Sequence, residues 1–347
     1  MDLREQPASG VAGLVVVLPV ALLIGFATGG AESSLRVVGP IVTFGLPAVA
    51  LIAFWWDDWP GVRLPGVWAG VTDTLIAAVA AVVFTILGQA VVDRVDFGAM
   101  LNPFPGPGRT ATFPATLPLA AGVFTAILQL TLVCEGWPVR KLRKIPAGLV
   151  GLALCWIVGI AGYLLVVRTH LVPGGVYGAW LTVLGVWQVV PYVALKGWPI
   201  NLIADDARRR AAGNALVIGG GWVSYLVCAT FLPPETITAV AGCAIAATLI
   251  VGMLLDSWLL ARTKTGILVM TAAATALTYW LLDASVRSNV WHPGAGTDDW
   301  IAFAALNAVG LAVILHVAIW RRWPVSALSR TRGNTDGADG RGYAAAG

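Results

Sequence analysis

The sequence predicts an all-α polytopic membrane protein with about ten transmembrane helices, built from five parallel two-helix repeats. Apolar residues make up 58% of the 347 residues and charged residues only 12%, which is more apolar than a soluble core of this length requires. Apolar stretches of ~20 residues, long enough to cross a ~30 Å hydrocarbon core, recur from end to end. A short tryptophan motif follows every second stretch and sets the period of the repeat.

The apolar stretches define the expected helices. The ten predicted spans are residues 11–29, 38–56, 69–92, 117–134, 147–167, 176–195, 214–232, 237–257, 266–283 and 300–320. They form one membrane domain over residues 11–323, preceded by a short N-terminal segment, residues 1–10. The tail, residues 324–347, is Gly-rich and polar, so we expect it to be disordered because it has too little apolar surface to bury.

Each repeat ends in a charged residue, one further residue and a tryptophan. The copies are DDWP at Trp59, EGWP at Trp137, KGWP at Trp198, DSWL at Trp258 and RRWP at Trp323, with 78, 61, 60 and 65 residues between successive tryptophans. At a helix end, the charge reaches water, the indole suits the polar boundary, and proline cannot continue the helix. We therefore interpret the five tryptophans as structural anchors at the membrane interface. Leu259 replaces proline in the fourth copy, so that helix is expected to extend about one turn further.

Basic residues predict the orientation, because Lys and Arg beside a span resist translocation. Only five of the 22 basic residues lie on the side opposite the tryptophan motifs: Arg36, Arg94, Arg109, Arg168 and Arg287. The sequence therefore predicts a protein of the cell membrane with both termini in the cytoplasm. Its basic cytoplasmic connections are expected to contact anionic lipids. Their arrangement in short clusters between spans argues against a nucleic-acid partner.

Polar side chains inside the spans are the candidates for a functional site, because such groups are costly to bury in a bilayer. Five residues qualify as candidates for binding substrate or protons: Asp73, Gln129, Gln188, Asn307 and His316. If Asp73 and His316 meet, they would form a proton-responsive pair. Each candidate also has a structural interpretation. Asp73 can reach interfacial water, and the others can hydrogen-bond between helices.

A small-solute transporter or permease is the function that this architecture favours, since a translocation path needs many helices and a few buried polar groups. This function predicts a polar cavity near the midplane between the third, fourth, sixth and tenth helices. The cavity should contain at least two of Asp73, Gln129, Gln188 and His316.

Two other classes of function stay open, and enzymatic activity is left uncertain. A membrane-embedded enzyme, or an accessory subunit, would act on a lipid or a lipid-linked substrate. Its site would be formed by the outward loops around Asp96, Arg109, His170 and His292. The remaining class is a membrane scaffold without its own chemistry.

Missing motifs argue against several kinds of chemistry. The three histidines have no metal-binding spacing, and neither HExxH nor a Cys/His pattern is present, so no metal site is expected. GxSxG, GxxxxGK[ST] and a strand-linked GxGxxG are also missing, so no nucleotide or other cofactor is expected. Cys134, Cys155, Cys228 and Cys243 are expected to pack as small apolar groups, although a disulfide between Cys228 and Cys243 is geometrically conceivable.

Two outward connections are long enough to have structure of their own. Residues 93–114 contain NPFPGPG, whose prolines favour an extended or turning path. Residues 284–299 contain NVWHPGAGTDD. Such loops can cover an outward cavity or serve only as connections.

Overall fold

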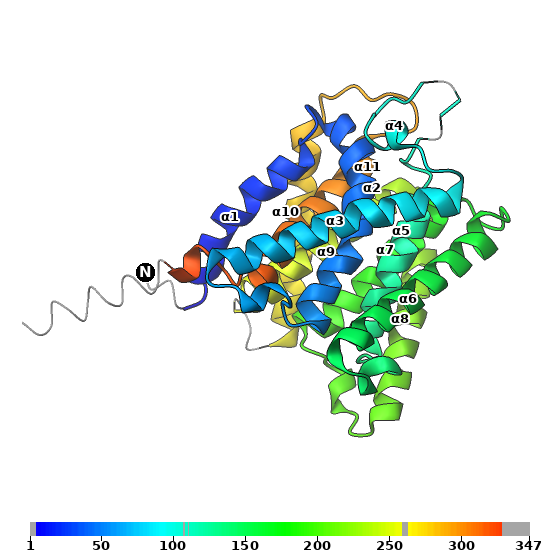
Figure 1. Ribbon diagram of the computed structural model, residues 1–347. Helices are drawn as coiled ribbons and strands as arrows, with labels where there is room; N and C mark the ends of the chain where they lie inside the picture. The colour runs from blue at the N-terminus through cyan, green and yellow to red at the C-terminus, as the bar shows by residue number, and fades with distance from the viewer. Residues whose placement is uncertain (1–4, 107, 110, 259–262, 328–347) are drawn as a thin grey trace, which may run out of the picture.

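The computed structural model describes residues 5–106, 108–109, 111–258 and 263–327, and this part of the chain is helical without any β-strand (Figure 1). Within it, nine helices are long and apolar enough to cross a membrane. They are α1 (Ala8–Gly25), α2 (Ala31–Ala50) with η1 (Leu51–Trp55), α3 (Val67–Val92), α6 (Lys144–Gly162) with η5 (Tyr163–Val167), α7 (Gly174–Val189) with η6 (Val190–Ala194), α8 (Asp206–Ala229), α9 (Pro234–Leu249) with η8 (Ile250–Leu254), α10 (Lys264–Val286), and α11 (Thr297–Ala302) with η9 (Phe303–Gly310), α12 (Leu311–Ile314) and η10 (Leu315–Ile319).

A shorter apolar helix, α5 (Leu117–Leu128) with η3 (Gln129–Val133), occupies the fourth predicted span. Each of the ten predicted spans therefore overlaps a helix, and the all-helical membrane class is confirmed. Four short elements lie in the connections: η2 (Gly61–Arg63), α4 (Phe97–Met100), η4 (Val139–Lys141) and η7 (Ile200–Leu202). Most of the predicted tail, from residue 328 onward, lies outside the described residues.

Some helices begin earlier than the apolar pattern indicates. Helix α2 starts at Ala31, and its first turns carry an ion pair between Arg36 and Glu32 at 2.8 Å. Helix α8 starts at Asp206, where the side chain of Asp205 accepts a hydrogen bond from the Arg208 backbone at 2.8 Å. Capping and i,i+4 pairing stabilise polar first turns, so hydropathy alone places these starts too late.

The helices form two layers. Five inner helices make a closed ring in which α2 contacts α5, α5 contacts α7, α7 contacts α9, α9 contacts α11 and η9, and η9 contacts α2. We call this the inner ring. The other five helices, α1, α3, α6, α8 and α10, surround it. In the most apolar window of each span, 72% of the residues of α2 and of α9 are buried, compared with 11% for α10.

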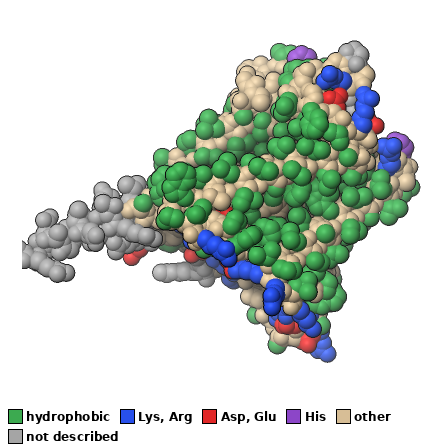
Figure 2. All heavy atoms as spheres, viewed as in Figure 1, with side chains coloured by type: hydrophobic (Ala, Val, Ile, Leu, Met, Phe, Trp, Pro, Cys, Tyr) green, Lys and Arg blue, Asp and Glu red, His purple; other side chains and the backbone are tan. Residues whose placement is uncertain are grey.

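Each outer helix packs mainly on the inner helix that precedes it. Helix α3 packs on α2, α6 on α5, α8 on α7 and α10 on α9, while α1 packs on η9 and closes the circle. The predicted repeat instead joins each outer helix to the inner helix that follows it in sequence. Packing therefore does not confirm those two-helix units. The outer helices present apolar side chains outward, such as Leu23, Val79 and Trp222, and Figure 2 shows apolar side chains across the middle of one face, with charged groups toward its ends.

The five inner helices end in the same local structure. Each closes with a five-residue π-helical turn: η1, η3, η6, η8 and η10. Two residues with positive φ follow each turn: Asp57 and Asp58, Glu135 and Gly136, Lys196 and Gly197, Asp256 and Ser257, and Arg321 and Arg322. In every copy the second of these residues donates its backbone N–H to the carbonyl six residues earlier, at 2.7–3.0 Å. This bond reaches one residue further than the bond that closes a Schellman helix end, and it follows a π-helical turn in every copy.

This shared ending corrects the predicted role of proline. The fourth copy has no proline, yet its helix ends at Leu254 like the others, and Asp256 and Ser257 are left-handed. Left-handed residues end a helix because they turn the chain away from its axis, so the expected extension is wrong. The Trp–Pro peptide bonds of the other four copies are cis. All four cysteines are free, and Cys228 and Cys243 form no disulfide.

Candidate functional site

A large hollow of the described structure lies inside the inner ring. We call it the central cavity, and its volume is about 1130 Å³. Residues of all five inner helices line it, including Gly39, Thr43, Ala121, Gly178, Thr182, Glu235, Thr238, Asp299, Phe303 and Asn307. These residues lie in the half of the ring opposite the tryptophan motifs. We call that side the loop side and the other the motif side.

The two long connections border the central cavity on the loop side. Residues 113–115 of the first connection and residues 294–296 of the second line it. The connections also touch each other, with the rings of Phe104 and His292 4.6 Å apart, and Figure 1 shows them side by side. Arg36 donates a hydrogen bond to the carbonyl of Pro293 at 3.0 Å. The connections thus help to shape the mouth of the cavity.

Charged side chains gather near this mouth. Glu235 lies in the first turn of α9, and Asp299 lies in the first turn of α11, where it accepts a hydrogen bond from Gly296 N at 2.9 Å. Arg168 and His170 follow η5, and Arg168 donates to the Val92 carbonyl at 2.8 Å. Two carboxylates and two basic side chains therefore line one cavity whose other walls are largely apolar, which is typical of a small-molecule site.

Asn307 supplies a polar group deeper in the cavity. Its side chain is only 5% exposed and donates a hydrogen bond to Thr43 Oγ1 at 2.7 Å. Its Oδ1 has no hydrogen-bond partner in the described structure. An unpaired buried acceptor costs about 1–3 kcal/mol, so a ligand donor placed here would gain free energy.

The motif side is closed by ion pairs between neighbouring helix ends. Two nitrogens of Arg209 donate to the two carboxylate oxygens of Glu135, at 2.7 and 3.0 Å. Two nitrogens of Arg321 donate to Asp58, at 3.0 and 2.9 Å. Two further pairs join Lys196 to Asp256, at 2.6 Å, and Lys144 to Asp57. We call this set of pairs the motif-side belt.

The belt explains why the charge before each tryptophan changes sign between copies. Asp57, Glu135, Lys196 and Asp256 each pair with a residue outside their own motif, and the sign follows the partner. The Arg209 guanidinium beside Glu135 holds the pKa of that carboxyl below its ordinary value. Arg322 extends the belt by donating to the Met253 carbonyl at 2.9 Å.

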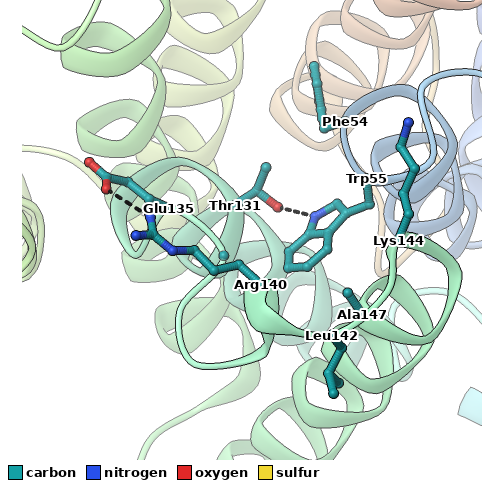
Figure 3. Close-up of a pocket in the computed structure, with 9 residues that line it drawn as sticks. Phe54, Trp55, Thr131, Glu135, Arg140, Leu142, Lys144 and Ala147 are labelled. Atoms are coloured by element: carbon teal, nitrogen blue, oxygen red, sulfur yellow. Dashed lines mark hydrogen bonds and ion pairs between the residues drawn. The ribbon is translucent and has the colours of Figure 1, made fainter.

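A smaller hollow of about 500 Å³ lies on the motif side between η1, η3 and α6 (Figure 3). Trp55 stands between Glu135 and Arg140 on one side and Lys144 on the other, and its indole N–H donates to Thr131 Oγ1 at 2.8 Å. The charged groups of this hollow already pair, Arg140 with Glu135 at 3.6 Å and Lys144 with Asp57. It therefore belongs to the belt.

Two of the predicted site residues meet. Gln188 Nε2 donates to Gln129 Oε1 at 2.7 Å, and Gln129 Nε2 donates to Asn214 Oδ1 at 2.8 Å. The chain of amides links α7, η3 and α8. This is the interhelical hydrogen bonding that was the structural interpretation of both glutamines. Neither residue lines the central cavity.

Asp73 and His316 lie apart from the cavity and share no hydrogen bond or ion pair. Asp73 is 1% exposed and accepts a hydrogen bond from Gly61 N at 2.9 Å, which fastens the connection after Trp59 to α3. His316 is buried beside Gly13 of α1, and neither of its ring nitrogens has a hydrogen-bond partner in the described chain. None of Asp73, Gln129, Gln188 and His316 is among the residues that line the central cavity. Of the five candidates, only Asn307 lines the central cavity.

The tryptophans of the motifs lie at the motif side, and Trp137, Trp198, Trp258 and Trp323 are 37–54% exposed. Trp59 is half-buried and packs edge-on against Trp56, with ring centroids 5.7 Å apart. Such positions suit interfacial anchors, a role that stays a prediction.

The residues expected at an enzyme site on the outward loops are divided between separate contacts. Asp96 pairs with Arg109 at 3.5 Å, and His292 pairs with Glu32 at 2.9 Å. Only His170 lines the central cavity. Within the described ranges, no group of three or more His, Cys, Asp or Glu side chains could hold a metal ion.

The sequence interpretation missed Glu235 and Asp299. Both follow turn residues in PPET and GTDD, where an acidic residue in the first helical turn has an ordinary capping explanation. Their common cavity depends on how α9 and α11 pack. Comparisons of the chain with models of protein families, with curated proteins and with solved structures found no match.

Proposed function

We propose that the protein is a small-solute permease that binds its solute in the central cavity. The observation that carries this proposal is the cavity of about 1130 Å³ lined by all five inner helices. A site formed by every helix of a ring changes shape when those helices tilt against one another. The cavity on one side and the belt of ion pairs on the other resemble one state of an alternating-access cycle.

The orientation and the repeat are part of this proposal. We place the motif side in the cytoplasm of a cell, because most basic residues flank the spans there, and we expect its basic connections to contact anionic lipids. The shared ending of the five inner helices supports an origin of the chain from five copies of a two-helix unit. Thiol labelling of single cysteines introduced on either side of intact cells would test the orientation.

Uptake into proteoliposomes tests the permease directly. Liposomes that contain the protein are incubated with a mixture of small solutes, and mass spectrometry identifies those that accumulate. Gly178→Trp should abolish the accumulation, because a side chain at Gly178 enters open space on the cavity wall. Gly219→Trp is the matched control. Gly219 also has open space around its Cβ position but lies on the outer helix α8.

The two variants separate a transport defect from a folding defect. Equal uptake by Gly178→Trp and the unmodified protein would contradict a path through the cavity. Uptake lost equally in both variants would show that the effect comes from folding or insertion.

A second candidate is an enzyme that acts on a lipid or a lipid-linked substrate. The specific observation in its favour is that Glu235, Asp299 and His170 line the same cavity, since carboxylates and histidine are the usual groups for acid–base catalysis. The same experiment distinguishes it from a permease. An enzyme would convert a component of the mixture or of the bilayer into a product, without net uptake.

A further inference from the structure

The inference concerns the class of solute and rests on the proposed binding site in the central cavity. Three residues of one continuous helical segment line that cavity at intervals of four: Asp299, Phe303 and Asn307. They place a carboxylate near the mouth, an aromatic ring below it and an amide deeper in the cavity. Glu235 on the neighbouring helix α9 adds a second carboxylate to the lining.

Asn307 lacks a partner that a buried amide oxygen normally has. Asn307 is only 5% exposed, and its Oδ1 accepts no hydrogen bond from the described residues. Its amide nitrogen is held by Thr43, which fixes the oxygen as the free end of the side chain. Glu235 is exposed and lines the same cavity, and its carboxylate has no side-chain hydrogen bond or ion pair within the described residues. Both groups accept hydrogen bonds and neither donates one at its free atom.

The chemistry of the wall favours a cation. Carboxylates attract a positive charge, the face of an aromatic ring does so through its quadrupole, and a free amide oxygen accepts an N–H. The lining has two carboxylates, Glu235 and Asp299, and one guanidinium, Arg168, which donates to the Val92 carbonyl at 2.8 Å. Apolar residues such as Leu35, Leu117 and Leu306 complete the lining. We infer that the central cavity binds an organic cation, a protonated amine with an apolar body.

Binding of three compounds with one apolar body and different head groups tests this inference. The probes are 4-phenylbutylamine, 4-phenylbutanol and 4-phenylbutyrate, which are cationic, neutral and anionic at neutral pH. Titration calorimetry on the full chain in detergent measures their affinities. The amine should bind at least ~10-fold more tightly than the alcohol, and the acid should bind most weakly.

Substitutions locate the binding in the cavity. Glu235→Gln and Asn307→Leu should each weaken amine binding by ~10-fold or more, the loss expected for one charged or buried polar contact. Glu5→Gln makes the same chemical change on the motif side and should leave the affinity unchanged. The thermal unfolding of each variant without ligand shows whether it is folded. Glu235→Gln is the decisive variant, because the Glu235 side chain has no hydrogen bond or ion pair to lose within the described residues.

Each outcome decides the inference. Failure of the amine to bind, equal or tighter binding of the acid, or an unchanged amine affinity in Glu235→Gln would overturn the cation site. Uptake measured in parallel separates this from the proposed function. Amine binding without uptake of any solute would refute the permease and keep the cation site. Uptake of a solute without amine binding would refute the cation site and keep the permease.

Discussion

The two ends of the inner ring are built from the same five helices but are packed differently. On the motif side, a Cβ at Gly252 would lie 3.1 Å from the Val193 carbonyl oxygen and 3.2 Å from the Ala194 Cα, so helix backbones touch there. On the loop side, a Cβ at Gly178 would have no atom within 4 Å. Ion pairs join neighbouring helix ends on the motif side, whereas the buried Oδ1 of Asn307 in the cavity wall has no hydrogen-bond partner in the described structure.

This difference shows how one ring of helices can be closed at one end and hollow at the other. Close backbone contact and ion pairs fix the helix ends on the motif side. On the loop side the space between helices is kept open at the expense of packing. Unfilled volume and unpaired polar groups lower stability, and binding sites are places where such costs persist because a ligand offsets them.

The largest expected effect contrasts the two glycines. Gly252→Ala should lower the free energy of unfolding by about 1–3 kcal/mol, because the added methyl group would press on the backbone of η6. Gly178→Ala should be neutral or stabilise the protein by up to ~1 kcal/mol, because alanine favours a helix and the space is open. Thermal unfolding of the purified protein in detergent measures both. Similar shifts for the two variants would show that the ends do not differ in packing.

A smaller effect contrasts two glutamates. Glu135→Gln removes the charge that faces Arg209 and should cost about 1–2 kcal/mol, since both side chains are less than a third exposed. Glu235→Gln, with no ion pair in the described structure, should cost less than ~1 kcal/mol, mainly through the helix dipole. Chemical or thermal unfolding compares them. A greater loss of stability in Glu235→Gln than in Glu135→Gln would contradict the assignment of the motif side as the structural end and the loop side as the binding end.

Acid should weaken the motif side through Glu135. Its pKa is lowered from the ordinary value of 4.5 because Arg209 donates two hydrogen bonds to it. The resulting stabilisation is complete above pH ~4.5 and is lost as the pH falls through the lower folded-state pKa. We expect a loss of about 1 kcal/mol, reduced by partial exposure. The unfolding temperature of Glu135→Gln should depend less on pH in this range, and parallel curves for the two proteins would contradict this origin.

The smallest expected effect concerns the pair between Lys196 and Asp256, whose side chains are 57% and 59% exposed. Asp256→Asn keeps a residue that tolerates positive φ and should change stability by less than ~0.5 kcal/mol. Any difference from the unmodified protein should vanish in ~1 M salt, where exposed charges are screened. A difference that survives in high salt would indicate a role beyond this ion pair.

Some contacts could be anticipated from particular residues, and others could not. Gln129 and Gln188 lie in apolar spans, where an amide needs a partner, and the structure joins them directly. Asp73 was read as facing water or a proton partner, but it accepts a hydrogen bond from Gly61, twelve residues earlier. That contact depends on how the chain turns after Trp59. The first left-handed residue before each tryptophan also has no consistent residue signal, because Glu135, Lys196 and Arg321 are not residues with a preference for positive φ.

Local composition determined the membrane class, the helical spans and the recurrence of one helix ending, because long apolar runs and terminal charges act within a single segment. Only the tertiary structure decided that alternate helices close into a ring, that Glu235 and Asp299 share a cavity with Asn307, and that Asp73 and His316 stay apart. These outcomes depend on which faces of different helices meet. All ten spans are almost uniformly apolar, so their sequences carry little information about which face turns inward.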